Sequence, residues 1–139
     1  MRLMIMMGAV LLSAGCSKDV VHEASGDEDS MRPPPGSNEM LRAPISGVDG
    51  IEVIISDVVI PANAAVPRHY HPGEEFLYVI EGSAIHVEEG KPDRELKAGD
   101  AYVIPPRAEH APRGGPEGAR AIVFRVHVAG AQERVLIED

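Results

Sequence analysis

Apolar and polar residues alternate in short runs along the chain beyond Pro44, and most of these runs are rich in Val and Ile. Turn residues separate the runs at fairly even spacing and helical periodicity is weak, which favours a β-sandwich or a small barrel. Because Gly reaches a positive φ cheaply and Pro presets a turn, we expect turns at Gly82, Gly90, Gly99 and Pro105. The predicted strands span residues 51–60, 68–71, 76–80, 84–88, 94–96, 101–104 and 121–128, with 134–138 as a further candidate. The fold class is therefore predicted to be all-β.

The first 16 residues have the pattern of an export signal. Arg2 precedes an apolar run over residues 3–12, which at about 1.5 Å per residue is too short to cross a hydrocarbon core of about 30 Å. The stretch that follows, Leu-Ser-Ala-Gly-Cys, resembles the lipobox of bacterial lipoproteins. This resemblance implies that residues 1–16 are a lipoprotein-type signal peptide and that Cys16 is lipidated. The alternative is an ordinary signal peptide with an unmodified thiol.

Residues 17–43 are rich in Ser, Gly, Pro and acidic side chains and have no sustained apolar period, so we expect a disordered tether there and a folded domain over 44–139. Ser17, directly after the Cys, resembles the residue of lipoproteins that are sent to the outer membrane. The protein is therefore expected to be exported and anchored by lipid in the bacterial cell envelope, in the outer membrane facing the periplasm.

Composition narrows the range of partners. A chain of 139 residues supports one small domain, and an aromatic content of 4% implies an aliphatic core. With 13 basic and 22 acidic residues the net charge is −9, which repels a nucleic-acid backbone and excludes that class of partner. The single Cys excludes an internal disulfide and a zinc site built from thiolates.

Three histidines and one glutamate are the candidate metal ligands. His69 and His71 are two residues apart in a predicted strand, so both imidazoles point to one face. Glu75 follows a Pro-Gly bend that lets its carboxylate return to the same place, and His110 follows a Pro-Pro turn. Such a set of nitrogen and oxygen ligands suits one divalent transition metal, Fe, Mn, Ni, Co, Cu or Zn, and does not select among them.

The spacing of these residues makes the pattern specific. His69-x-His71-x₃-Glu75-x₆-Gly82 resembles the first motif of the cupin superfamily, and Gly99-x₅-Pro105-x₄-His110 resembles the second. The resemblance covers about residues 53–128 and is closest to small single-domain cupins of the cupin-2 type. It implies a jelly-roll β-barrel that holds one metal on His69, His71, Glu75 and His110.

Three positions depart from the cupin motifs, and none of them is a ligand. Asn63 and Arg107 stand where the family usually has Gly, and Gly114 stands where it usually has Asn. Asn tolerates the left-handed region, so the first turn can survive, whereas Arg107 in that region would cost about 1–2 kcal/mol.

A barrel-bound metal with open positions implies that a small molecule binds there. The resemblance to cupins with this ligand set implies a dioxygenase-like oxidoreductase first and a metal-assisted lyase or isomerase next. Glu75 is the candidate catalytic residue, because it either tunes the metal or detaches to act as a base. The alternative is a lipid-anchored protein that binds a metal or small ligand without turnover. A core this small would also gain from pairing into a homodimer.

Four further polar residues are expected to lie outside the site. His86 alternates with apolar neighbours in its strand and is expected to face solvent. Arg107 is expected to be a solvated surface residue. Arg125 and His127 share one face of the last long strand, and we do not expect them to touch a substrate.

Overall fold

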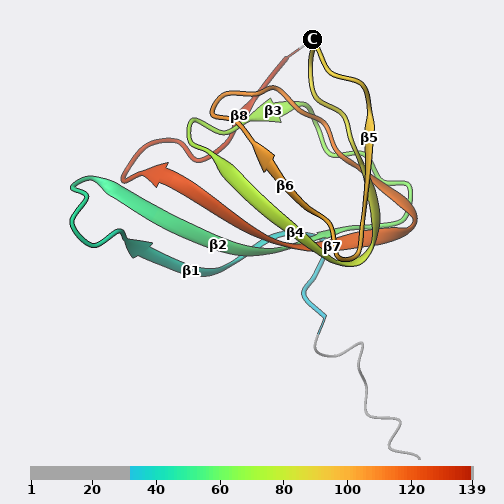
Figure 1. Ribbon diagram of the computed structural model, residues 1–139, viewed down its shortest axis with the longest axis horizontal. Helices are drawn as coiled ribbons and strands as arrows, with labels where there is room; N and C mark the ends of the chain where they lie inside the picture. Colours follow the sequence, from blue (N-terminus) through green and yellow to red (C-terminus); the bar gives the residue numbers. More distant parts are fainter. Residues whose placement is uncertain (1–31, 139) are drawn as a thin grey trace, which may run out of the picture. The chain divides into compact units, whose positions relative to one another are not determined.

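Eight β-strands and no helix make up residues 32–138, the part of the chain that this computed structural model describes (Figure 1). The predicted all-β fold class is confirmed. Within this range no helix is long and apolar enough to span a membrane. The strands are β1 (Gly36–Pro44), β2 (Ile51–Ile60), β3 (His69–Tyr70), β4 (Glu75–His86), β5 (Arg94–Lys97), β6 (Ala101–Ile104), β7 (Arg113–Val128) and β8 (Val135–Leu136).

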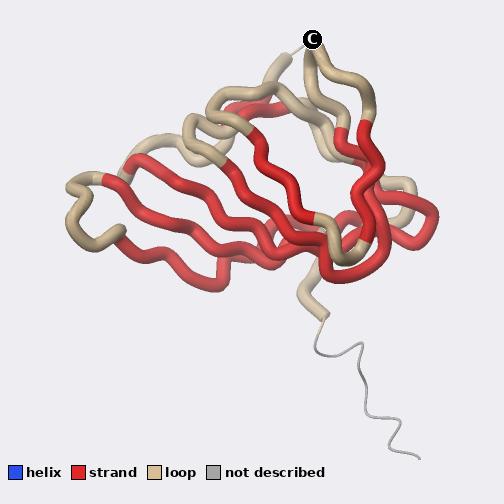
Figure 2. The backbone as a smooth tube through the Cα atoms, in the orientation of Figure 1, coloured by secondary structure: helices blue, strands red, loops and turns tan. Residues whose placement is uncertain are grey.

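The larger of two antiparallel sheets contains six strands in the order β1-β2-β7-β4-β5, and β6 also pairs with β4 (Figure 2). Consecutive strands pair at both ends of this order, whereas in the middle β2 pairs with the distant β7, from Ile51↔Val128 to Ile60↔Ala119. One side of the sheet buries an aliphatic core, as the low aromatic content predicted. Its residues are Ile54, Val59, Val79, Ala84, Leu96, Ile104, Ala119 and Val123.

The smaller sheet is the pair β3-β8, which Figure 1 shows as a separate layer over the curved large sheet. Isolated bridges extend this layer, since His110 pairs with His69 on one side and with Glu88 on the other. The two backbone hydrogen bonds between His69 and His110 measure 3.0 and 2.8 Å. This pairing brings together two histidines that are 41 positions apart in the sequence.

The turn expected at Gly82 is wrong, because Gly82 lies inside the continuous strand β4. The strand runs through Gly82 without ending, and it changes partner from β6 at residues 75–78 to β5 at residues 83–86. Gly82 has a φ of 65°, and a Cβ there would lie 2.1 Å from the carbonyl oxygen of Gly118. A residue without a side chain therefore allows the strand to bend against β7.

The expected tether boundary is also wrong, because Gly36–Pro44 forms β1 along the edge of the large sheet. Its backbone pairs with β2 from Gly36↔Val59 to Pro44↔Glu52, with a register shift between Glu39 and Leu41. An edge strand with mostly exposed side chains carries no apolar alternation that a sequence reading would detect. The expectations for the signal peptide, for Cys16 and for the tether before residue 32 fall outside the described residues.

The two left-handed turns considered in the sequence are present. Asn63 has a φ of 58° and Arg107 has a φ of 62°. Asn adopts this conformation readily, whereas at Arg107 it costs about 1–2 kcal/mol. The Arg107 amide donates a 2.8 Å hydrogen bond to the carbonyl oxygen of His71, so the strained turn is tied to the strand that carries the candidate ligands.

Candidate metal centre

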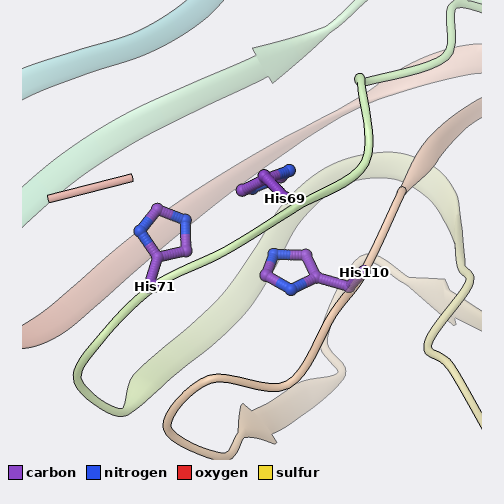
Figure 3. Close-up of side chains that lie close together, drawn as sticks. All are labelled: His69, His71 and His110. Atoms are coloured by element: carbon purple, nitrogen blue, oxygen red, sulfur yellow. The ribbon is translucent and has the colours of Figure 1, made fainter. Parts of the chain in front are cut away.

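His69, His71 and His110 converge inside the barrel (Figure 3). One nitrogen from each ring lies within 4.8 Å of the corresponding nitrogen of the others, and each side chain is at most 6% exposed. His69 and His71 project from the same face of the chain around β3, and the bridge between His69 and His110 supplies the third ring. The structure therefore brings together the three histidines that the sequence selected.

A backbone carbonyl holds each ring at Nδ1. His69 Nδ1 lies 2.7 Å from the Pro67 oxygen, His71 Nδ1 lies 2.7 Å from the Glu133 oxygen, and His110 Nδ1 lies 2.8 Å from the Ala108 oxygen. A carbonyl oxygen only accepts, so each Nδ1 carries the proton and each Nε2 keeps a free lone pair. This is the tautomer in which a histidine binds a metal through Nε2.

The electrostatic environment keeps these rings neutral. Burial lowers the pKa of His69 to about 3, with a further contribution from His110. Burial also lowers the pKa of His71 and of His110. At neutral pH the three rings are uncharged, which is the form that a metal requires.

Glu75 lies beside this cluster but is held by an arginine. Its Oε2 accepts a 2.5 Å hydrogen bond from Arg125 Nε and lies 3.4 Å from His71 Nε2. Burial is the largest influence on Glu75 and opposes its ionisation, but the charge of Arg125, the neighbouring His71 and His110 and the hydrogen bond from Arg125 together outweigh burial, so the pKa of Glu75 is lowered. Glu75 is therefore a buried carboxylate next to the three rings but outside the group of atoms that all lie within 4.8 Å of one another, and its role as a fourth ligand stays a prediction.

Arg125 connects the site to the C-terminal segment. Its guanidinium also contacts Ser56 Oγ at 3.3 Å and Glu133 Oε1 at 3.1 Å. Glu133 in turn supplies the carbonyl that anchors His71. Arg125 and His127 were not expected to touch a substrate, but Arg125 is 7% exposed and lines the pocket. Its partner Glu133 carried no signal in the sequence, because it lies outside both motifs.

A cavity of about 190 Å³ opens over the candidate ligands. Small-molecule pockets commonly measure about 300–1,000 Å³, so this one suits a small ligand. Within residues 32–138, every fully buried side-chain nitrogen or oxygen atom has a hydrogen-bond partner. Nε2 of His69 and of His110 makes no such bond in this range, so both atoms open onto the cavity. The apolar part of the wall includes Val58, Ile60, Val66, Leu77, Val79 and Leu96.

His86 also lines this cavity, which corrects the expectation that it faces solvent. The side chain is 4% exposed, and its Nε2 lies 3.1 Å from Glu88 Oε2. The same Glu88 oxygen accepts a 3.2 Å hydrogen bond from Tyr102, and the other Glu88 oxygen pairs with Lys91 at 2.6 Å. The alternation pattern placed His86 on the wrong face because the pairing of β4 with β7 shifts register on either side of Gly82, so that the buried positions change from odd numbers (Glu75, Val79) to even numbers (Ala84, His86).

The donor set fits a divalent transition metal. Three neutral imidazoles with fixed tautomers and convergent lone pairs form a nitrogen donor set that leaves room for an exogenous ligand, and an ionised carboxylate lies next to it. An all-β fold with a cluster of three histidines in its interior places this chain in the class of small β-barrels with a candidate metal site. Within that class the chain belongs to the cupin domain family, whose model matches residues 56–125, half of the chain.

Curated relatives share part of this domain. The chain is 39% identical over 56 residues to dimethylsulfoniopropionate lyase DddQ of Ruegeria pomeroyi, covering 40% of this chain and 28% of that protein. It is 38% identical over 79 residues to dimethylsulfoniopropionate lyase DddW of the same organism, covering 52% and 51%. It is 36% identical over 73 residues to 3-hydroxyanthranilate 3,4-dioxygenase of Burkholderia lata, covering 50% and 42%. The matched part therefore spans about half or less of each relative.

Solved structures agree with the fold. The crystal structure of DddQ from Ruegeria pomeroyi superposes with a TM-score of 0.55 at 26% identity, covering 71% of this chain and 51% of that one. A cupin-like protein from Thermotoga maritima gives a TM-score of 0.55 at 27% identity, covering 71% and 74%. An RmlC-like cupin with a double-stranded β-helix fold from Methanocaldococcus jannaschii, 15% identical, covers 70% and 84% with a TM-score of 0.58, which shows the fold alone.

Replacing His71 with Gln will lower the metal content of the protein, because one of three convergent lone pairs is lost. It will also lower the melting temperature of the metal-loaded protein towards that of the apoprotein, since an ion that binds only the folded state stabilises it. Elemental analysis after loading with zinc, together with thermal unfolding, measures both effects.

His127→Gln is the matched control. His127 is 3% exposed, and its ring bonds the Ala131 carbonyl oxygen at 3.2 Å, outside the set of convergent rings. This variant is expected to keep its full metal stoichiometry. If His71→Gln also kept it, His71 would not be a ligand.

Proposed function

We propose that this protein is a mononuclear metal-dependent cupin that binds a small molecule in the barrel, on His69, His71, Glu75 and His110. The observation that carries the proposal is the convergence of three histidines whose Nδ1 atoms are each bound to a backbone carbonyl. An arrangement that fixes tautomer and direction in this way is typical of metal ligands. The metal is one of Fe, Mn, Ni, Co, Cu or Zn.

We propose a dioxygenase-like oxidoreductase as the activity. The similarity to 3-hydroxyanthranilate 3,4-dioxygenases over half of this chain supports it. When bound, the metal supplies a Lewis acid with open positions for small ligands. The chain itself holds the substrate in an apolar cavity, excludes bulk water and keeps Glu75 ionised beside the site. Glu75 is the proposed catalytic residue, either as a ligand or as a base.

A metal-assisted lyase is the second candidate. Two dimethylsulfoniopropionate lyases match in sequence, and the DddQ crystal structure superposes at 26% identity. The non-catalytic alternative is that the same site holds a metal or small ligand without turnover, which the small cavity would also serve.

Three assays on the metal-loaded protein separate these functions. With iron(II) and 3-hydroxyanthranilate, the oxidoreductase is expected to consume oxygen, as measured with an oxygen electrode. With dimethylsulfoniopropionate, a lyase would release a volatile sulfide, measured in the headspace. His110→Gln is expected to abolish whichever activity is present. Stoichiometric metal with neither reaction would favour the binding function, and failure to bind any of the six metals would refute all three.

We further propose that the chain is exported and held by a lipid on Cys16 in the bacterial envelope, in the outer membrane facing the periplasm. The support is the sequence of residues 1–17 alone. Cells labelled with radioactive palmitate are expected to incorporate label into the wild type and not into Cys16→Ala. Label retained by Cys16→Ala would refute lipidation at this residue.

Finally, we propose that the barrel pairs with a second copy through the outer face of the large sheet. Phe76 pairs with Val103 on one side and with Phe124 on the other, and these three side chains are 39–42% exposed. This cross-strand apolar row lies on a chain that otherwise carries a strong negative charge. Light scattering of Cys16→Ser is expected to give a dimer mass, and Phe124→Glu in that background a monomer. A monomeric Cys16→Ser protein would refute pairing.

A further inference from the structure

One arginine in the described segment differs from all the others. Eight of the nine arginines in residues 32–138 either pair with a carboxylate or lie over a tyrosine ring. They are Arg32, Arg42, Arg68, Arg113, Arg120 and Arg125, each within 4.0 Å of an acidic side chain, and Arg94 and Arg107, over Tyr102 and Tyr70 at about 5 Å. Arg134 makes neither contact in this range. Because acidic residues outnumber basic ones in this chain, most arginines are expected to find a carboxylate partner, and Arg134 is an exception within the described residues.

Arg134 lies at the candidate site. Its guanidinium lines the cavity, and Nη2 lies 3.4 Å from His69 Nδ1. The only hydrogen bond that it donates within residues 32–138 goes to the Pro67 carbonyl oxygen, at 3.3 Å, and that oxygen also anchors His69. The residue itself remains exposed, so Arg134 stands where the cavity meets solvent.

The charges around the cavity also favour an anion. Its lining includes two carboxylates, Glu75 and Glu133, and two guanidiniums, Arg125 and Arg134. Arg125 binds both carboxylates, which leaves Arg134 next to a second cation. Burial and the charge of Arg125 lower the pKa of Arg134, so the surroundings disfavour this positive charge. Because the four side-chain charges cancel, a divalent ion would leave the lining with a net positive charge that an anionic ligand would offset.

We propose that Arg134 binds the carboxylate of the ligand, and that the substrate class is therefore a small carboxylic acid with an apolar body. This inference rests on the proposed metal-dependent function. The carboxylate receives charge-assisted hydrogen bonds from the fork of the guanidinium, the apolar body lies against Leu77, Val79 and Leu96, and another donor group faces the histidines. The cavity of about 190 Å³ limits the ligand to a small molecule. Arg134 is a specificity-determining residue in this arrangement.

Two probes that differ by one carboxylate test the proposal. The full-length protein is loaded with zinc, which supports no redox turnover, and titrated calorimetrically with 3-hydroxyanthranilate and with 2-aminophenol, which has the same amino and hydroxyl groups and lacks the carboxylate. The wild type is expected to bind the carboxylate probe about tenfold tighter or more, the range of a charge-assisted contact. Arg134→Gln is expected to bind both probes about equally, and Arg134→Lys to keep part of the preference.

Arg113→Gln is the control for loss of one positive charge, because Arg113 pairs loosely with Asp93 at 3.8 Å on the surface. It is expected to retain the wild-type preference. Equal affinity of the wild type for the two probes, an unchanged preference in Arg134→Gln, or no binding of 3-hydroxyanthranilate to the zinc-loaded wild type would each overturn the role of Arg134. Metal stoichiometry is measured in the same samples: absence of bound zinc in the wild type would count against the proposed metal site itself.

Discussion

The hydrogen bonds from imidazole Nδ1 to backbone carbonyl oxygens are the constraint on which the rest of the site depends. A histidine side chain has two rotatable bonds and two tautomers, so proximity alone would leave the nitrogens free to diverge. The carbonyls of Pro67, Ala108 and Glu133 remove that freedom at each ring. Because these oxygens belong to backbone segments that the barrel holds in place, the fold itself determines where the three Nε2 atoms lie.

The three carbonyls come from chain segments that meet only in the folded state. Pro67 precedes β3, Ala108 follows β6, and Glu133 precedes β8. The bridge between His69 and His110 joins the first two segments, and the β3-β8 pair joins the third. The smaller sheet is short, yet it aligns all three anchors. The smaller sheet positions the three candidate ligands, whereas the large sheet provides the buried aliphatic core.

The sequence predicted the parts of this site that depend on local spacing. The bounds of β2 and β6 agree with the predicted strands 51–60 and 101–104, since alternation and turn residues delimit both. The H-x-H spacing and His110 were sufficient to select the three rings. The strand bounds and the H-x-H pair depend on backbone geometry within a few residues. His110 lies 41 positions from His69, and it was selected through the resemblance to the second cupin motif.

Features that depend on contacts between distant segments were missed. Gly36–Pro44 lacks alternation because it is an edge strand, so its pairing with β2 could be seen only in the fold. His86 was assigned to the wrong face because register shifts between β4 and β7 on either side of Gly82 reverse the alternation along β4. Arg125 takes part in the site through its hydrogen bond to Glu75, which lies 50 positions away in the sequence. A single sequence contains no signal for such pairs.

The contact between Arg125 and Glu75 does not prevent Glu75 from acting on a metal. A buried carboxylate without a partner is costly, and breaking such a pair typically costs about 3–5 kcal/mol, so the arginine accounts for the ionised state of Glu75 in a closed interior. The arginine uses only Oε2. Oε1 makes no hydrogen bond within residues 32–138, and Glu75 lines the cavity. One oxygen is held by the protein while the other remains available, and the same carboxylate can therefore be stabilised in the absence of an ion and still offer a lone pair to one.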